Sequence, residues 1–143
     1  MDKTQSLRAI RYNANQILVE SRAKTATLDN YDYLFLFVKR LDTISLCIMF
    51  GQGFENEPVA NIVANTVHKA VMALIPTYGL GDFDWEGTGE DLTRLVHGAW
   101  VVLRDCGEDG MAQAICDRHN LFVTMCEMQE KLDEQWLTDL AND

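Results

Sequence analysis

The stretch NEPVANIVANTVHKAVMALIP, residues 56–76, decides the fold class of this chain. Pro58 stands near its start, where the first turn of a helix tolerates proline, and Pro76 stands at its end, where proline stops a helix. Between the two prolines, apolar residues recur in steps of three and four, which is the period of one helix face. That face contains Val59, Ile62, Val63, Val67, Ala70, Val71 and Leu74. The stretch therefore predicts an amphipathic α-helix.

The same period predicts a helix on the N-terminal side, over residues 4–26. Most of the basic residues in this segment lie off its apolar stripe, as expected for a helix with one buried face. The stripe consists of Leu7, Ile10, Ala14, Ile17 and Leu18.

The segment DNYDYLFLFVKRLDTISLCIMFGQG, residues 29–53, has two interpretations. As one buried helix it would be capped by Asp29 or Asn30 and would end at Gly51. As two strands, YLFLFV and TISLCIMF would pair across a turn at KRLD. We favour the helix, because the surrounding helices offer an isolated hairpin no sheet to join. Its buried face would hold Leu34, Phe37, Val38, Leu41, Ile44 and Ile48.

A fourth helix is predicted to begin at Thr88, which with Asp91 resembles a capping box, and to stop near Gly107. Its apolar stripe consists of Leu92, Leu95, Val96, Ala99, Val102 and Leu103.

The last predicted helix runs from Gly110 to about Leu140, with Asp109 as its cap and a break near His119–Asn120. Its inner face is expected to hold Met111, Ile115, Phe122, Met125, Leu132 and Trp136. Together these segments predict an all-α, single-domain bundle of about five helices over residues 1–143, with a glycine-rich acidic loop before the fourth helix.

Charge indicates the class of partner. The net charge is −10, so direct binding to nucleic acid or to an anionic membrane is disfavoured and a basic protein is the expected partner. The alternative is that the acids serve solubility alone. Residues 1–28 have a net charge of +3 and residues 79–143 a net charge of −11. The basic first helix could meet the acidic face in its own chain or in a second copy, so we also predict a homodimer.

The loop GDFDWEGTGED, residues 81–91, resembles the opening of a calcium-binding loop, with Asp82, Asp84 and Glu86 at the first ligand positions. The twelfth position, which needs a bidentate carboxylate, is Thr93, so we expect no calcium site. The other glycines of this loop allow the chain to turn, and the acids next to the following helix face the positive end of its dipole. Phe83 and Trp85 are either core residues or exposed aromatic anchors for a basic partner.

Other candidate chemistry is incomplete. Cys116 and His119 have the spacing of a zinc pair, but Cys126 lies almost three helical turns from Cys116. His68, His97 and His119 accompany neither a G-x-S-x-G motif nor a glycine-rich phosphate loop. The carboxylates of the last helix lack the Glu-x-x-His motif of di-iron bundles. We therefore expect no metal, no cofactor and no enzymatic activity.

Cysteine use and the N-terminus indicate the compartment. The first ten residues, MDKTQSLRAI, lack the apolar core of a signal peptide, and none of the four cysteines forms a C-x-x-C pair. No run of about 20 apolar residues could form a membrane span. We expect a cytoplasmic protein with reduced thiols.

The favoured functional hypothesis is an inhibitor that occludes a basic, nucleic-acid-binding protein such as a nuclease by presenting carboxylates as a nucleic-acid mimic. Immunity proteins against nuclease toxins and phage inhibitors of host defence provide the analogy, in charge and size. The predicted partner surface is Asp82, Phe83, Asp84, Trp85, Glu86, Glu90, Asp91, Glu127, Glu130, Asp133 and Glu134. The alternative is a regulatory helical module that binds a small molecule or an apolar peptide between its helices. The six methionines of the chain, with Met111, Met125 and Met128 on one helix, would suit an adaptable apolar groove.

Overall fold

The computed structural model describes residues 2–24, 34–51, 53–76 and 89–142. Every regular element within these ranges is helical, which confirms the predicted all-α bundle of about five helices. The elements are α1, Lys3–Lys24; α2, Leu34–Phe50; the short 3₁₀ helix η1, Phe54–Asn56; α3, Val59–Leu74; α4, Glu90–Asp105; and α5, Asp109–Ala141. Since α2 is one continuous helix, the hairpin alternative is wrong. None of the described helices is long and apolar enough to cross a membrane.

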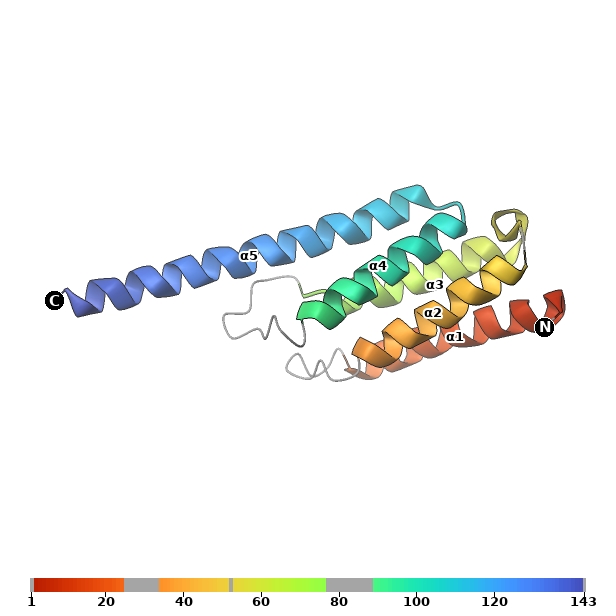
Figure 1. Cartoon of the computed structure of the whole chain (residues 1–143), viewed down its shortest axis with the longest axis horizontal. Coiled ribbons are helices and arrows are strands. Elements are labelled where there is room, and N and C mark those ends of the chain that lie inside the picture. Colours follow the sequence, from red (N-terminus) through yellow and green to blue (C-terminus); the bar gives the residue numbers. More distant parts are fainter. Residues whose placement is uncertain (1, 25–33, 52, 77–88, 143) are drawn as a thin grey trace.

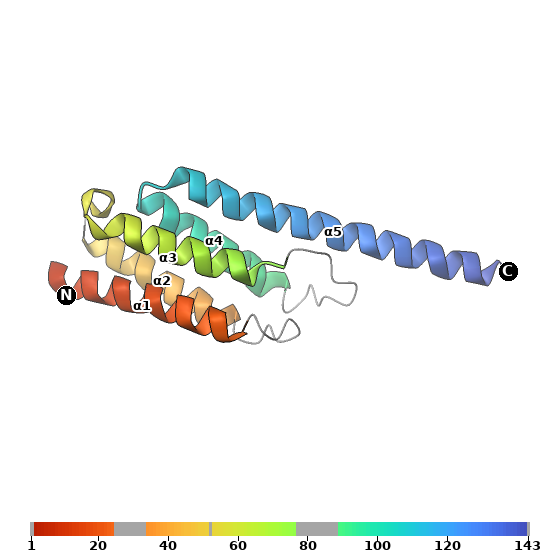
Figure 2. The ribbon, with the colours of Figure 1, turned by 180° about the vertical axis from the view of Figure 1, so that it is seen from behind.

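Helices α1 and α5 lie at opposite long edges of the bundle (Figures 1 and 2). α1 packs against α2 and α3, whereas α5 packs against α4 and α3. The contact between α2 and α4 joins the two sides around one core. α5 has 33 residues and α4 has 16, so α5 continues well beyond one end of the bundle (Figure 1).

The buried faces follow the three- and four-residue steps of the sequence. In α4 all six predicted stripe residues, from Leu92 to Leu103, are buried. In α3 the predicted face is wrong at Ile62, which is 56 % exposed. Ala60 and Ala64 are buried in its place. These two small residues belong to the inner stripe, which is therefore rotated away from Ile62.

The observed helix ends test the starts and stops that the sequence predicts. Gly107 has a left-handed φ of 81° and ends α4, as predicted. Its N–H donates to the Arg104 carbonyl, and the Glu108 N–H donates to the Leu103 carbonyl, each at 2.9 Å, which is the Schellman pattern. α5 begins at Asp109 itself, so Asp109 is not its cap, and the helix has no break near residues 119–120. The predicted cap at Thr88 lies outside the described residues.

A fork of hydrogen bonds fixes α2 against α1. The Arg40 guanidinium donates to both carboxylate oxygens of Glu20, at 2.7 and 3.4 Å, and to the Asn13 side-chain oxygen at 3.2 Å. The three side chains are partly buried at the contact between the helices. Bidentate geometry of this kind is specific as well as strong, so it contributes to the register of the two helices.

Candidate functional site

Five of the predicted site residues, Asp82, Phe83, Asp84, Trp85 and Glu86, lie in the segment 77–88, outside the described residues. The predicted calcium-like loop begins in the same segment. The other six predicted site residues are described, and they lie on two elements. Glu90 and Asp91 form the first turn of α4, and the remaining four acids lie on α5.

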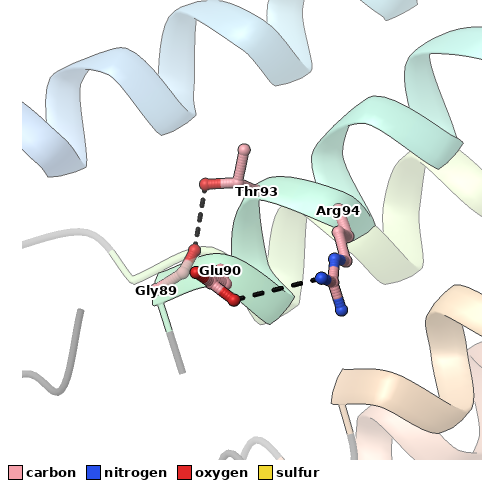
Figure 3. Close-up of a pocket in the computed structure, with 4 residues that line it drawn as sticks. All are labelled: Gly89, Glu90, Thr93 and Arg94. Atoms are coloured by element: carbon pink, nitrogen blue, oxygen red, sulfur yellow. Dashed lines mark hydrogen bonds and ion pairs between the residues drawn. The ribbon is translucent and has the colours of Figure 1, made fainter. Parts of the chain in front are cut away.

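The start of α4 is a weakly compensated acidic turn. Arg94 lies 3.9 Å from the carboxylates of both Glu90 and Asp91, and the Arg94 and Glu90 side chains are each 66 % exposed. Exposed ion pairs of this length contribute little to stability, so the carboxylates remain available to a partner. Thr93 donates its hydroxyl to the Gly89 carbonyl at 2.9 Å, and these residues line an open hollow of about 290 Å³ (Figure 3).

The second half of α5 leaves the bundle. The buried residues of this helix end at Cys126. From residue 127 to residue 142, every residue is exposed except the half-buried Gln129. We call this segment the α5 arm. Figures 1 and 2 show it extending past the end of the bundle at which α4 begins. At about 1.5 Å per residue, its 16 residues span about 24 Å.

The α5 arm corrects two sequence predictions. Leu132 and Trp136 were expected on the inner face of the last helix, but each is 63 % exposed. Both residues follow the predicted three- and four-residue spacing of apolar residues. They are exposed because the arm extends beyond the neighbouring helices, so nothing in the described chain covers them. The length of α5, about twice that of α3 or α4, was the signal that some of its apolar residues would remain unpaired.

Four predicted site acids lie together on the arm: Glu127, Glu130, Asp133 and Glu134. With Asp139 they give five carboxylates against one cation, Lys131. Within the described residues, none of the five forms an ion pair. Asp133 and Asp139 accept hydrogen bonds from Gln129 and Gln135, at 3.0 and 2.9 Å. The arm is therefore a displayed, uncompensated array of negative charge, at the same end of the molecule as the start of α4 (Figure 1).

The thiols have the properties of core residues. Burial, together with a smaller effect of the neighbouring carboxylates of Asp105 and Glu108, raises the pKa of the Cys106 thiol to about 12. Burial also raises the pKa values of Cys47 and Cys116. Because the thiolate is the reactive form, these thiols are unsuited to nucleophilic chemistry at neutral pH. Among the described side chains, no three His, Cys, Asp or Glu residues converge as a metal site would require.

A second hollow lies near the junction of α4 and α5. It has a volume of about 510 Å³, is open to solvent, and is lined by Ile48, Met49, Gly53, Phe54, Glu55, Arg104, Asp105 and Gly107. Arg104 is already engaged, because its Nε lies 3.5 Å from the Asp109 carboxylate and its guanidinium stacks 4.9 Å from the centre of the Trp100 ring. The open shape of this hollow and its engaged cation give it little support as a ligand site.

The three methionines of α5 do not gather at one place. Met111 and Met125 are half-buried, and Met128 is exposed on the arm. Met111 and Met128 are separated by about 26 Å along the axis of α5, at about 1.5 Å per residue. They therefore do not line a single pocket.

Comparisons with protein-family models, with curated proteins and with solved structures found no match for this chain.

Proposed function

We propose that this chain is a protein-binding inhibitor, whose acidic end binds a basic partner protein and occludes the surface with which that partner binds nucleic acid. The observation that carries the proposal is the α5 arm, which displays five carboxylates with no cationic partner among the described residues. Glu90 and Asp91 extend the same acidic end, and Asp82, Asp84 and Glu86 belong to the proposed surface by sequence.

The spacing of the carboxylates supports mimicry of a nucleic acid. From Glu127 to Glu134 the helix rises about 10.5 Å, so the four carboxylates of this stretch occur on average about every 3.5 Å along the axis, whereas Asp139 lies on the opposite side of the helix from Glu130. A single strand of B-DNA carries one phosphate about every 3.4 Å along the axis. The linear charge densities are similar, and a groove lined by Lys and Arg would accept either array. A partner with such a groove is the expected target, a nuclease being the simplest example, and the expected compartment is the cytoplasm.

The alternative function, a module for a small molecule or an apolar peptide, has less support. Its best candidate site is the open 510 Å³ hollow, where the one cation, Arg104, is already paired with Asp109. Ligand sites are usually concave and enclosed, with free polar groups that orient the ligand. The acidic arm is therefore the stronger basis for function.

Competition with nucleic acid tests the proposal. Proteins from the native host are captured on the immobilised chain, identified, and purified, and each is then mixed with a labelled DNA or RNA that it binds. The chain should displace the nucleic acid with one-to-one stoichiometry per binding site, and displacement should weaken between about 0.1 and 0.5 M salt, because the contacts are ionic. If no captured protein binds nucleic acid, or if the chain and the nucleic acid bind together, the proposal is wrong.

A further inference from the structure

A row of exposed side chains runs along the outer face of α2. Its members follow one another in steps of four, three, four and three, which is the spacing of the contact seam of a coiled coil. This α2 row consists of Phe35, Lys39, Asp42, Leu46 and Met49, and Phe50 follows Leu46 by four residues. All six residues are exposed, Met49 by 71 % and Phe50 by 72 %. Large apolar side chains gathered in water mark an interaction surface, and the proposed inhibitor function does not use this one.

The α2 row stays outside the bundle because the opposite side of the helix is buried. Phe37, two residues from Phe35, is buried. Ile44, two residues from Leu46, is also buried. Two residues correspond to about half a helical turn, so the row points away from the core. Figure 1 shows α2 and α4 in front of α1 and α3, whereas α5 packs against α4 and α3. The α2 row is therefore separate from the α5 arm.

Two charges at the centre of the row have no ionic partner within the described chain. Lys39 and Asp42 are both exposed, and neither belongs to an ion pair there. The Lys39 ammonium lies over the Phe35 ring, 5.9 Å from its centre, so this side chain is directed along the row. Along the helix the row has the order apolar, positive, negative, apolar.

This order is complementary to itself when the helix direction is reversed. At each end of the row, the apolar residue and the neighbouring charged residue are four residues apart, so an antiparallel copy presents the same spacing. Phe35 then packs against Leu46 of the second copy. Lys39 meets Asp42 of the second copy in the same way. Each contact occurs twice, as a two-fold interface between identical surfaces requires.

We propose that the α2 row binds a second copy of this chain, in an antiparallel two-fold dimer whose register is set by two contacts between Lys39 and Asp42. The sequence predicted a homodimer through the basic first helix and the acidic half of the chain, and the α2 row provides a different interface. Met49 and Phe50 extend the apolar end beyond Leu46, and their contacts on the second copy fall outside the described residues. Both arms remain exposed, so the dimer does not depend on the partner proposed above.

The charges select one register. If the second copy slid by four residues in one direction, Lys39 would face Leu46 of the second copy. A slide by four residues in the other direction would place Phe35 against Asp42. Either shift puts a charge against an apolar side chain, which costs free energy unless the charge is paired. Polar residues in an apolar seam commonly specify the register of paired helices in this way.

The charges also select the antiparallel orientation. A parallel two-fold pair would place Lys39 beside Lys39 of the second copy and Asp42 beside Asp42. Like charges placed side by side at an interface are destabilising. The antiparallel pair replaces these contacts with two attractive ones, and it is therefore the favoured arrangement.

Charge-reversed variants of the full chain test this dimer. The first variant carries Lys39→Glu, the second carries Asp42→Lys, and the third carries both substitutions. Both side chains are exposed, and circular dichroism and thermal melting check the fold of each variant. The single controls Lys69→Glu and Asp117→Lys make the same charge changes on exposed sites of α3 and α5.

Sedimentation velocity and light scattering from about 1 to 200 µM, a range that brackets a weak homodimer, measure the mass. The wild type, both controls and the third variant should dimerise. The first and second variants should each dimerise at least about tenfold more weakly, because like charges then meet at both contacts. An equal mixture of the first and second variants should recover a one-to-one dimer, since one chain then carries only negative charge in its α2 row and the other only positive charge.

Any of three results would overturn the proposal: a monomeric wild type at every concentration, a first or second variant that dimerises as strongly as the wild type, or a third variant or mixture that stays monomeric. The second result would indicate a parallel pair, in which one reversal adds no like-charge contact, or an interface on another helix. All these variants keep the carboxylates of the arm, so their affinity for a basic partner should stay near that of the wild type. Capture of that partner therefore reports on the proposed inhibitor function separately from the dimer.

Discussion

At the scale of single residues, His119 is the least satisfied polar group in the described chain. Its Nε2 atom is buried and has no hydrogen-bond partner among the described residues. Burial lowers the pKa of this imidazole below its ordinary value, because the charged form loses hydration. A buried polar atom without a partner costs about 1–3 kcal/mol. His119 therefore weakens the contact of α5 with the bundle, and more so in acid.

Replacing His119→Leu should stabilise the fold, and its benefit should grow as the pH falls. The unfolded chain binds a proton at this imidazole near pH 6.5, whereas the folded chain resists it, so the wild type loses stability as the pH falls through that value. Burial raises the pKa of Asp105, which acts in the opposite direction, but Asp105 is present in both proteins. Urea unfolding from about pH 7.5 to 5.5 measures the difference in stability. A difference that is constant over this range would show that His119 does not carry the effect.

At the scale of helices, the sequence predicted the positions of the helices better than it predicted which of their side chains are buried by neighbouring helices. The periods of α3 and α4 and the stop at Gly107 were predicted because they depend on local chemistry, namely side-chain spacing, proline and a left-handed glycine. The inner face of α5 was wrong at Leu132 and Trp136, because burial depends on where the neighbouring helices end. The acids Glu127, Glu130, Asp133 and Glu134 were grouped correctly, because they share one continuous helix.

The crossing of α2 and α4 depends on a glycine. A Cβ at Gly98 would lie 3.3 Å from Cβ and 3.4 Å from Cδ1 of Leu41, which is fully buried. Gly98→Val should therefore destabilise the fold by about 1–3 kcal/mol through overpacking. Gly110, in the first turn of α5, has open space around its Cβ position, so Gly110→Ala should stabilise the fold by up to about 1 kcal/mol.

Chemical denaturation of the two glycine variants measures both effects. Stabilisation of the fold by Gly98→Val, which helix propensity alone would give, would mean that the contact with Leu41 does not limit the approach of α2 to α4.

At the scale of the whole molecule, charge is separated along the structure. The basic residues of α1 lie on one long edge, and the acids of the arm extend from the other edge past the end of the bundle (Figure 1). The sequence alone predicted this imbalance between the two halves of the chain. It did not predict that the second half of the last helix leaves the bundle, which is why Leu132 and Trp136 are exposed on the same arm as these acids.

The central claim is that the acidic side of the arm binds a basic partner. Calorimetry with a captured partner measures the affinity of two triple variants. The arm variant carries Glu127→Gln, Glu130→Gln and Glu134→Gln. The control carries Asp42→Asn, Glu55→Gln and Asp117→Asn, and it removes the same charge from exposed sites elsewhere. The arm variant should bind at least about tenfold more weakly, a loss of about 1.4 kcal/mol or more, and the control should bind nearly as the wild type does. Equal affinities of the two variants, at unchanged melting temperature, would contradict the claim.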